Sequence, residues 1–333
     1  MDKKIIALFS IIALNSCTAQ VGFESKAFKN SYETITASDL KKHLYIIAGD
    51  EMEGRDTGSE GQKKAGRYMI EEYKKMGISQ PKSMADYYQK VPAEFMNGKR
   101  GSLPDSENIL AFIEGSEKPE EIIVISAHYD HVGMDSKGVV YNGADDDGSG
   151  TVGVMEIAEA FQFAKKNGNG PKRSILFLHV TGEEHGLHGS RYYAENPVFP
   201  MANTVVDLNI DMIGRDDPAN RGKDYVYVIG SEMLSKELKV INETSNSKTV
   251  KLELNYKYDD KNDPDRLYYR SDHYNFAKNG IPVIFYFDGI HEDYHKPTDT
   301  PDKIDYELLK KRTQLVFATA WELANREARI KVD

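Results

Sequence analysis

The sequence predicts a single α/β domain with a central mixed, mostly parallel sheet flanked by helices. Short apolar runs such as Ile122–Ile125 are typical of strands that are buried on both faces. These runs alternate with amphipathic stretches of helical spacing, as in a sheet that helices cover on both sides. The chain has 333 residues, of which 40% are hydrophobic. This is enough apolar surface for the core of one large domain or two modest ones.

Two helices are expected before the first buried strand. Asp39–Ile47 has helical spacing, and Ser38 stands in the position of its N-cap. Glu60–Met76 is predicted to be a second helix. Charged residues lie on one face of this segment, and Gly77 is a typical residue for the end of a helix. Pro81–Glu107 is mixed in composition, so we expect an irregular segment there.

The rest of the chain alternates predicted strands and helices. The strands are Ile122–Ile125, Ser174–Val180, Thr204–Ile210, Tyr225–Ile229 and Ile281–Phe287. The helices are Val152–Phe163, Arg191–Glu195, Glu232–Glu243 and Tyr306–Glu327. The sequence shows no internal repeat, and we expect one domain over residues 31–333.

The first residues of the chain have the pattern of an export signal. Lys3 and Lys4 precede an apolar run of about ten residues, which is too short to span a membrane. Leu14–Cys17 resembles a bacterial lipobox, although an ordinary secretory signal with an incidental cysteine is the alternative. We expect a lipoprotein signal peptide at residues 1–16 and a tether at 17–30. The protein would then be exported and anchored only through a lipid on Cys17, in the outer membrane, the periplasm or at the cell surface.

Charge and cysteine content exclude several classes of protein. Lys and Arg number 43 against 53 Asp and Glu, and no basic block is present. Nucleic acid is therefore a poor partner, because neutralising phosphates needs clustered Lys and Arg. Cys17 is the only cysteine, so an intramolecular disulfide and a thiolate metal site are both excluded.

His, Asp and Glu side chains follow the predicted strands at five points. They are His128–His131, Asp145–Asp147, Glu183-Glu184, Asp211 and Asp288–His295. The carboxyl ends of such strands meet at one edge of the sheet. Carboxylates packed there without partners would repel one another and lose hydration, a penalty that one or two divalent cations would remove.

The residue types at this edge favour zinc. Imidazole and carboxylate without sulfur suit Zn²⁺, with Mn²⁺ or Co²⁺ as alternatives, and argue against Ca²⁺, which prefers oxygen alone. Because carboxylates outnumber histidines, a pair of ions that share a bridging carboxylate is favoured over a single site. Each motif alone could be a solvated turn or a helix cap, and it is their combination that predicts a metal centre.

The order of the motifs resembles the di-zinc aminopeptidase family. That family includes the bacterial leucyl aminopeptidases and is related to glutamate carboxypeptidase and the transferrin receptor. The resemblance covers the chain from about Asp50 to the C-terminus, and Gly54–Ser59 is similar to bacterial members. The matching motifs are His128-x-Asp130, Asp146 within Asp-Asp-Asp-Gly-Ser-Gly, Glu183-Glu184, Asp211 within Asn-Ile-Asp-Met-Ile-Gly, Ser271-Asp272-His273 and His295.

The resemblance implies two zinc ions per chain and a ligand set. His128 and Asp211 would bind one zinc, Glu184 and His295 the other, and Asp146 would bridge the two ions. The peptide bond after Asp146 would be cis, as it is in the family. His131, His185 and His188 do not belong to the family pattern, and we interpret them as local hydrogen-bonding or surface residues.

The resemblance also implies roles for four other residues. Asp130 would accept the second ring N–H of His128 and so set its tautomer. Glu183 would be the general base, and Tyr294 would donate to the developing oxyanion. Arg270 matches a family arginine near the substrate.

The expected activity is that of a metallo-aminopeptidase. Such an enzyme would hydrolyse the N-terminal bond of a peptide through a metal-bridging hydroxide, with a glutamate as general base. A carboxypeptidase or dipeptidase with the same metal core and a glutaminyl-cyclase-like transferase are the alternatives, and a receptor-like binding module would be expected to have lost ligands. The pocket walls are expected at Asp216–Asp224, Tyr256–Tyr269 and Phe285–Tyr294, but the sequence predicts neither the side-chain preference nor the oligomeric state.

Overall fold

The computed structural model describes residues 22–98 and 101–333. The predicted signal peptide at 1–16 and the predicted lipid site at Cys17 lie outside the described residues. Among the helices of the described ranges, none is both long and apolar enough to cross a membrane.

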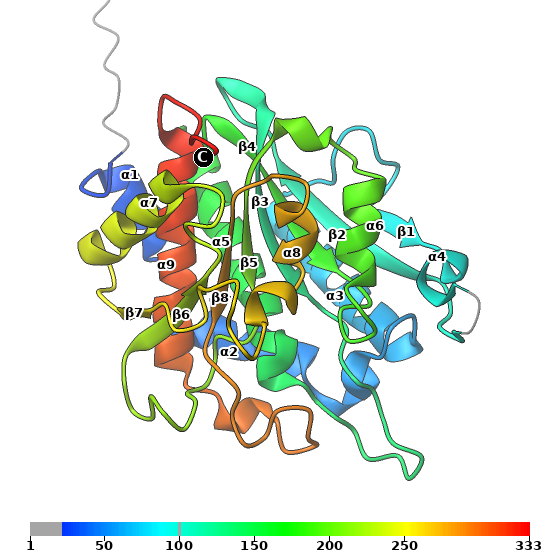
Figure 1. The fold of residues 1–333 in the computed structure, drawn as a ribbon. Coiled ribbons are helices and arrows are strands. Elements are labelled where there is room, and N and C mark those ends of the chain that lie inside the picture. Colours follow the sequence, from blue (N-terminus) through cyan, green and yellow to red (C-terminus); the bar gives the residue numbers. More distant parts are fainter. Residues whose placement is uncertain (1–21, 99–100) are drawn as a thin grey trace, which may run out of the picture.

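Eight strands of the described chain form one twisted sheet in the order β1-β2-β4-β3-β5-β8-β6-β7 (Figure 1). Their bounds are β1 Tyr88–Val91, β2 Ser106–Ile113, β3 Lys118–His128, β4 Arg173–Val180, β5 Thr204–Ile210, β6 Tyr225–Ile229, β7 Glu253–Asn255 and β8 Val283–Phe287. The pairs β3–β4, β3–β5, β5–β8 and β6–β7 are parallel, whereas β1–β2, β2–β4 and β6–β8 are antiparallel. The predicted mixed, mostly parallel sheet is therefore confirmed.

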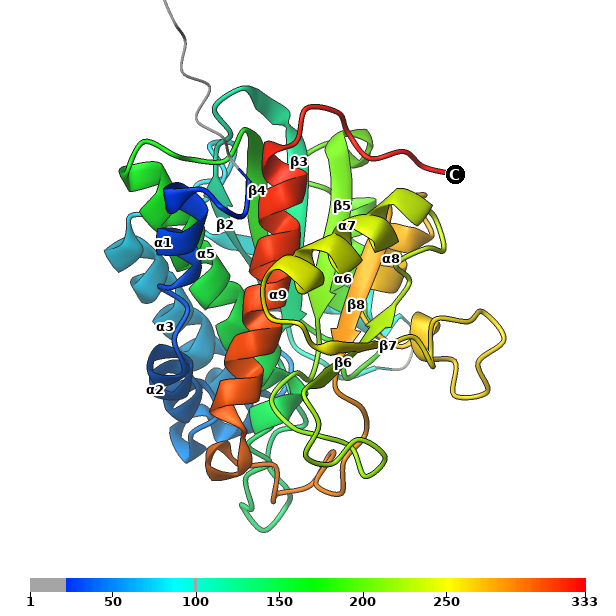
Figure 2. The same cartoon turned by 90° about the vertical axis from the view of Figure 1, so that its left-hand side faces the viewer.

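Helices cover both faces of this sheet (Figures 1 and 2). One face packs against α1 Lys26–Tyr32, α2 Ala37–Ile47, α3 Glu60–Met76, α5 Gly150–Lys166, α7 Lys236–Lys248 and α9 Tyr306–Asn325. The short helices α4 Ala93–Asn97, α6 His188–Glu195 and α8 His273–Ala277 complete the set, and α6 and α8 pack on the opposite face. Two hydrophobic layers result, one on each side of the sheet.

Local sequence signals explain where several elements begin and end. The hydroxyl of Ser59 accepts the N–H of Gln62 at the start of α3, and Gly77 ends the helix in the left-handed conformation with φ of 76°. The predicted bounds of this helix are confirmed to the residue. In α2, however, the N-cap is Thr36, which accepts the N–H of Asp39, so the prediction of Ser38 was wrong.

The prediction of an irregular segment at Pro81–Glu107 was also wrong. It contains β1, α4 and the first residues of β2. Three of the four β1 residues are only partly buried or exposed, so the segment lacks the apolar run of a central strand. Pairing with β2, which in turn pairs with β4, defines the strand.

The predicted tether at 17–30 is too long. Lys26–Tyr32 forms α1, which Ser25 caps by accepting the N–H of Phe28. The Phe28 ring is 3% exposed and packs on Phe317 and Trp321 of α9, with centroid separations of 5.8 and 5.7 Å. So short a helix is stabilised mainly by tertiary packing, and here the Phe28 ring packs in the core.

Candidate metal centre

The predicted ligands come together at the carboxyl ends of four neighbouring strands. His128 is the last residue of β3, Glu184 lies shortly after β4, and Asp211 directly follows β5. His295 lies in the segment that follows β8. Asp146 lies in the turn Ala144–Ser149, which leads into α5. The arrangement agrees with the rule that functional groups of such sheets gather at this edge.

Asp146 stands between two histidines. Its Oδ1 is 3.2 Å from His128 Nε2, and its Oδ2 is 2.9 Å from His295 Nε2. Each oxygen of one carboxylate thus faces a different imidazole, which is the geometry that a bridging ligand requires. The peptide bond between Asp146 and Asp147 is cis, as the resemblance implied.

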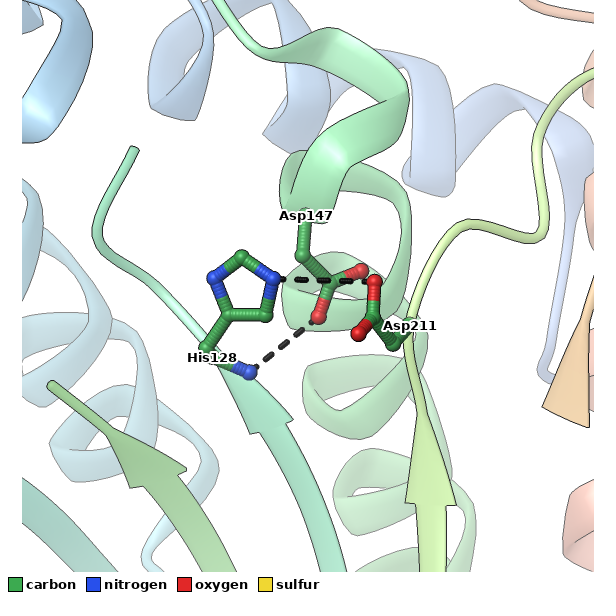
Figure 3. A group of neighbouring side chains, drawn as sticks. All are labelled: His128, Asp147 and Asp211. Carbon is green, nitrogen blue, oxygen red and sulfur yellow. Dashed lines mark hydrogen bonds and ion pairs between the residues drawn. The ribbon is translucent and has the colours of Figure 1, made fainter. Parts of the chain in front are cut away.

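The other two predicted ligands extend the two sides of this bridge. Asp211 Oδ1 lies 3.6 Å from His128 Nε2 (Figure 3). Glu184 Oε2 lies 3.0 Å from His295 Nε2. His128 and Asp211 therefore lie on one side of Asp146, in the first half of the candidate centre, and Glu184 and His295 lie on the other side, in its second half.

Asp147 also belongs to the first half, although the sequence motifs do not predict it as a ligand. Its carboxylate comes close enough to His128 and Asp211 to share a cation with them (Figure 3). Both of its oxygens, however, already accept backbone N–H groups, from His128 at 3.1 Å, Gly150 at 2.9 Å and Met212 at 3.1 Å. Asp147 thus connects three segments of the site, and its place three residues before the first residue of α5, whose N–H it accepts, was the signal that could have identified it.

His131 is a close neighbour of the second half. It is fully buried, and its Nδ1 lies 2.8 Å from Glu184 Oε1 and 3.8 Å from Asp146 Oδ2. These three residues could share a cation, so His131 competes geometrically with His295 for this role. His185 instead contacts Asp56 at 2.9 Å, and His188 contacts Arg191.

Asp130 orients His128, but through a different atom from the expected one. The backbone carbonyl of Asp130 is 3.1 Å from His128 Nδ1, whereas its carboxylate is 3.8 Å away. This carboxylate accepts the backbone N–H of Glu183 and the hydroxyl of Thr57. The carbonyl contact leaves His128 Nε2 free to face the centre of the site.

A cavity opens beside the bridging carboxylate. Its acidic side consists of Asp146, Glu183 and Asp211, and Arg270 and Tyr294 also line it. Its apolar residues are Met212, Leu267, Phe285, Phe287 and Ile290. Two of the predicted pocket walls therefore contribute. The third, Asp216–Asp224, does not, because buried Asp217 holds that segment in a turn of its own by accepting the N–H of Asn220.

The electrostatics of the site suit a bound cation. Burial by itself would raise the pKa of Asp146, but contacts with His128 and His295 outweigh burial and hold it well below its usual value. Burial raises the pKa of Glu183 well above its usual value, and the charge of Asp211 adds to this effect. Several buried ligand atoms have no hydrogen-bond partner in the described chain, namely His128 Nε2, Asp146 Oδ2, Glu184 Oε1 and His295 Nε2. Because such atoms are rarely left unsatisfied, a divalent cation fits this donor set.

The chain is similar to known proteins both in sequence and in fold. The model of peptidase family M28 matches residues 108–320, and the chain belongs to this family. A probable leucine aminopeptidase from Arthroderma benhamiae is 30% identical over 222 residues, which cover 65% of this chain and 57% of the relative. The chain thus spans just over half the length of such curated relatives.

Two solved structures illustrate the similarity of fold. A zinc aminopeptidase from Bacillus subtilis aligns with a TM-score of 0.67 and 17% identity, covering 88% of this chain and 96% of that one. A glutaminyl cyclase from Porphyromonas gingivalis aligns with a TM-score of 0.66 and 18% identity, covering 86% of this chain and 97% of that one. At these identities the similarity concerns the fold.

Proposed function

We propose that this chain is a zinc-dependent exopeptidase that removes the N-terminal residue of peptides. The observation that carries the proposal is the position of Asp146, whose two oxygens face His128 and His295 at 3.2 and 2.9 Å. Membership of family M28 and the aminopeptidase names of a relative and a structural neighbour support it.

The residues present would hold two zinc ions. His128 and Asp211 would bind one ion, Glu184 and His295 the second, and Asp146 would bind both. Imidazole nitrogen and carboxylate oxygen are ligands that zinc prefers in the absence of thiolate. Bound zinc supplies an acidified water at neutral pH and polarises the carbonyl of the scissile bond.

Glu183 would move the proton. Its side chain lines the cavity beside Asp146 and Asp211, and its backbone N–H is anchored on Asp130 Oδ1 at 3.2 Å. Because burial raises its pKa, the carboxylate is a stronger proton acceptor than an exposed glutamate. It would take the proton of the attacking water and deliver it to the leaving amine.

Tyr294 would donate a hydrogen bond to the substrate carbonyl. It lines the cavity, and its ring stacks on His295 with a centroid separation of 3.9 Å. Burial raises the pKa of its hydroxyl, so the group stays protonated and remains a donor. The acidic side of the cavity would attract a free amino terminus, which favours cleavage at that end of the peptide.

Export and lipid attachment at Cys17 are part of the proposal. Their support is the sequence pattern alone, in which two lysines precede an apolar run and Leu14–Cys17 resembles a lipobox. The protein would then act outside the cytoplasm, anchored in the outer membrane or in the periplasm.

A comparison of two peptides and two variants tests the activity. Zinc bound per chain is measured, and amino acid release is followed from an unblocked peptide and from its N-acetylated form. We expect about two zinc ions per chain and cleavage of the unblocked peptide only. Glu183→Gln should lower the rate by about 100- to 10,000-fold, whereas Glu114→Gln, an exposed glutamate that pairs with Lys82, should leave it unchanged.

Other outcomes would replace the proposal. Equal cleavage of the acetylated peptide with release of its C-terminal residue would indicate a carboxypeptidase. Cyclisation of an N-terminal glutamine with one zinc per chain would indicate a glutaminyl-cyclase-like transferase. Activity that is insensitive to Glu183→Gln would contradict the assigned base.

A further inference from the structure

We infer that residues 53–58, here called the brace, hold the metal-binding loops in position, with Arg55 and Thr57 as positioning residues. The inference rests on the proposed zinc centre. The brace precedes the segment that the family model matches, residues 108–320, yet it contacts the loops that carry His128, Asp146 and Glu184.

Arg55 joins two of these loops. Its side chain is completely buried, and its guanidinium donates to four backbone carbonyls and to no carboxylate among the described residues. The acceptors include Tyr129 at 2.9 Å, Asn142 at 2.6 Å and Gly143 at 2.9 Å. Tyr129 directly follows a predicted ligand, and Gly143 lies three residues before Asp146. One planar fork thus sets the distance between two ligand-bearing loops.

Thr57 connects the brace with the third loop. Its hydroxyl donates to Asp130 Oδ2 at 2.9 Å, and both residues are buried. The other oxygen of Asp130 accepts the N–H of Glu183 at 3.2 Å, and its backbone carbonyl faces His128 Nδ1 at 3.1 Å. Thr57 therefore fixes a residue that orients both a predicted ligand and the segment that carries Glu184.

The backbone of the brace is fitted to the same loops. The N–H of His131 donates to the carbonyl of Arg55 at 3.1 Å, and that of Gly133 donates to the carbonyl of Gly54 at 3.0 Å. Gly54 has φ of 67°, and a Cβ there would lie 2.2 Å from the carbonyl oxygen of Gly133. Only glycine permits this approach.

Arg55 also places a buried positive charge beside the acidic centre. The carboxylates of Asp130, Asp146, Asp147 and Asp299 all act on it electrostatically. Burial lowers the pKa of Arg55, whereas these four carboxylates favour its charged form. The hydrogen bonds of the brace therefore preform the geometry of the site.

The test is the zinc affinity of the metal-free full chain, measured by titration against a competing chelator. Thr57→Val keeps the shape of the side chain and removes the hydroxyl, and we expect zinc binding to weaken by about 10- to 100-fold. Thr57→Ser restores the hydroxyl and should restore affinity. The matched control is Thr319→Val, which removes a buried hydroxyl that donates to Asn242 between α7 and α9.

If Thr57 had only a structural role, its loss would lower the melting temperature of the metal-free chain. The melting temperature of the metal-free chain should fall no further in Thr57→Val than in Thr319→Val, while zinc affinity falls only in Thr57→Val. Arg55→Lys, which keeps the charge but loses the planar fork, should also weaken zinc binding.

Three results would overturn the inference: unchanged affinity in Thr57→Val, an equal loss in both valine variants, or no zinc binding by the wild-type chain. If the chain binds zinc but cleaves no peptide, the proposed function fails, and the brace is still judged by affinity alone.

Discussion

At the scale of single residues, the candidate centre brings imidazoles and carboxylates within contact distance, although several of their atoms have no hydrogen-bond partner in the described chain. Asp146 has imidazole nitrogens 3.2 and 2.9 Å from its two oxygens, and Glu184 has His131 and His295 within 3.0 Å. The two histidines beside Glu184 approach different oxygens of its carboxylate. Only one of them is needed to complete a four-ligand zinc site.

Exchanging each of these two histidines for asparagine distinguishes their roles. We expect His295→Asn to lose about one of two zinc ions per chain, and His131→Asn to retain both with weaker binding. Zinc per chain after dialysis is the measurement. His188→Asn, which changes a histidine outside the centre, is the control. Loss of zinc from His131→Asn instead would make His131 the ligand and place His295 beside it.

At the scale of elements, part of the predicted tether forms the helix α1, and one aromatic residue packs this helix against the core. Phe28 packs between α1 and α9 against Phe317 and Trp321. The side chain of the neighbouring residue Lys29 is exposed and forms an ion pair with Glu24 at 2.7 Å. The folded unit therefore includes α1.

Phe28→Ala should lower the free energy of unfolding by about 3 kcal/mol, because it removes a buried ring and leaves a cavity. Urea unfolding of the metal-free chain measures this change. Lys29→Ala is the control and should leave stability almost unchanged, because exposed ion pairs contribute little. Equal stability of the two variants would mean that α1 does not support the core.

Elements whose own residues define them were predicted accurately, whereas elements that depend on a distant partner were not. β5 and β6 were predicted to the residue, since both are buried along their whole length and each ends at a change of composition. β1 was missed because it is a half-buried edge strand, and only its partner β2 makes it a strand. Thr36 and not Ser38 is the N-cap because the backbone is extended at Thr36 and the helix already begins at Ala37, which the sequence pattern did not indicate.

At the scale of the whole molecule, the core contains ionisable groups that are held neutral. His179 on β4 is fully buried, and its Nε2 is 2.7 Å from the hydroxyl of Tyr73 on α3. Burial lowers the pKa of His179 to about 3. In the unfolded chain this histidine would have a pKa near 6.5. Between about pH 3 and 6.5 the unfolded state therefore binds more protons than the folded state.

This difference predicts acid sensitivity with a definite sign. The stabilisation from neutral His179 is complete above about pH 6.5 and is lost as pH falls toward 3, because only the unfolded state gains the proton. Between pH 7 and 5 the wild-type chain should lose about 2 kcal/mol more stability than His179→Gln. Urea unfolding of both metal-free chains at the two pH values tests this. Parallel losses would show that His179 does not titrate on unfolding.

The sequence by itself determined the class of sheet, the kinds of ligand and their position after the strands. These features depend on hydrophobic periodicity and on the order of motifs, which are local properties of the chain. Tertiary structure decided which atoms meet, namely the carbonyl of Asp130 on His128, the approach of His131 to Glu184, and the contact of Arg55 with Gly143. Distances near 3 Å between segments that lie far apart in the chain arise only when the core packs, because packing fixes which buried polar atoms come within hydrogen-bond distance of one another.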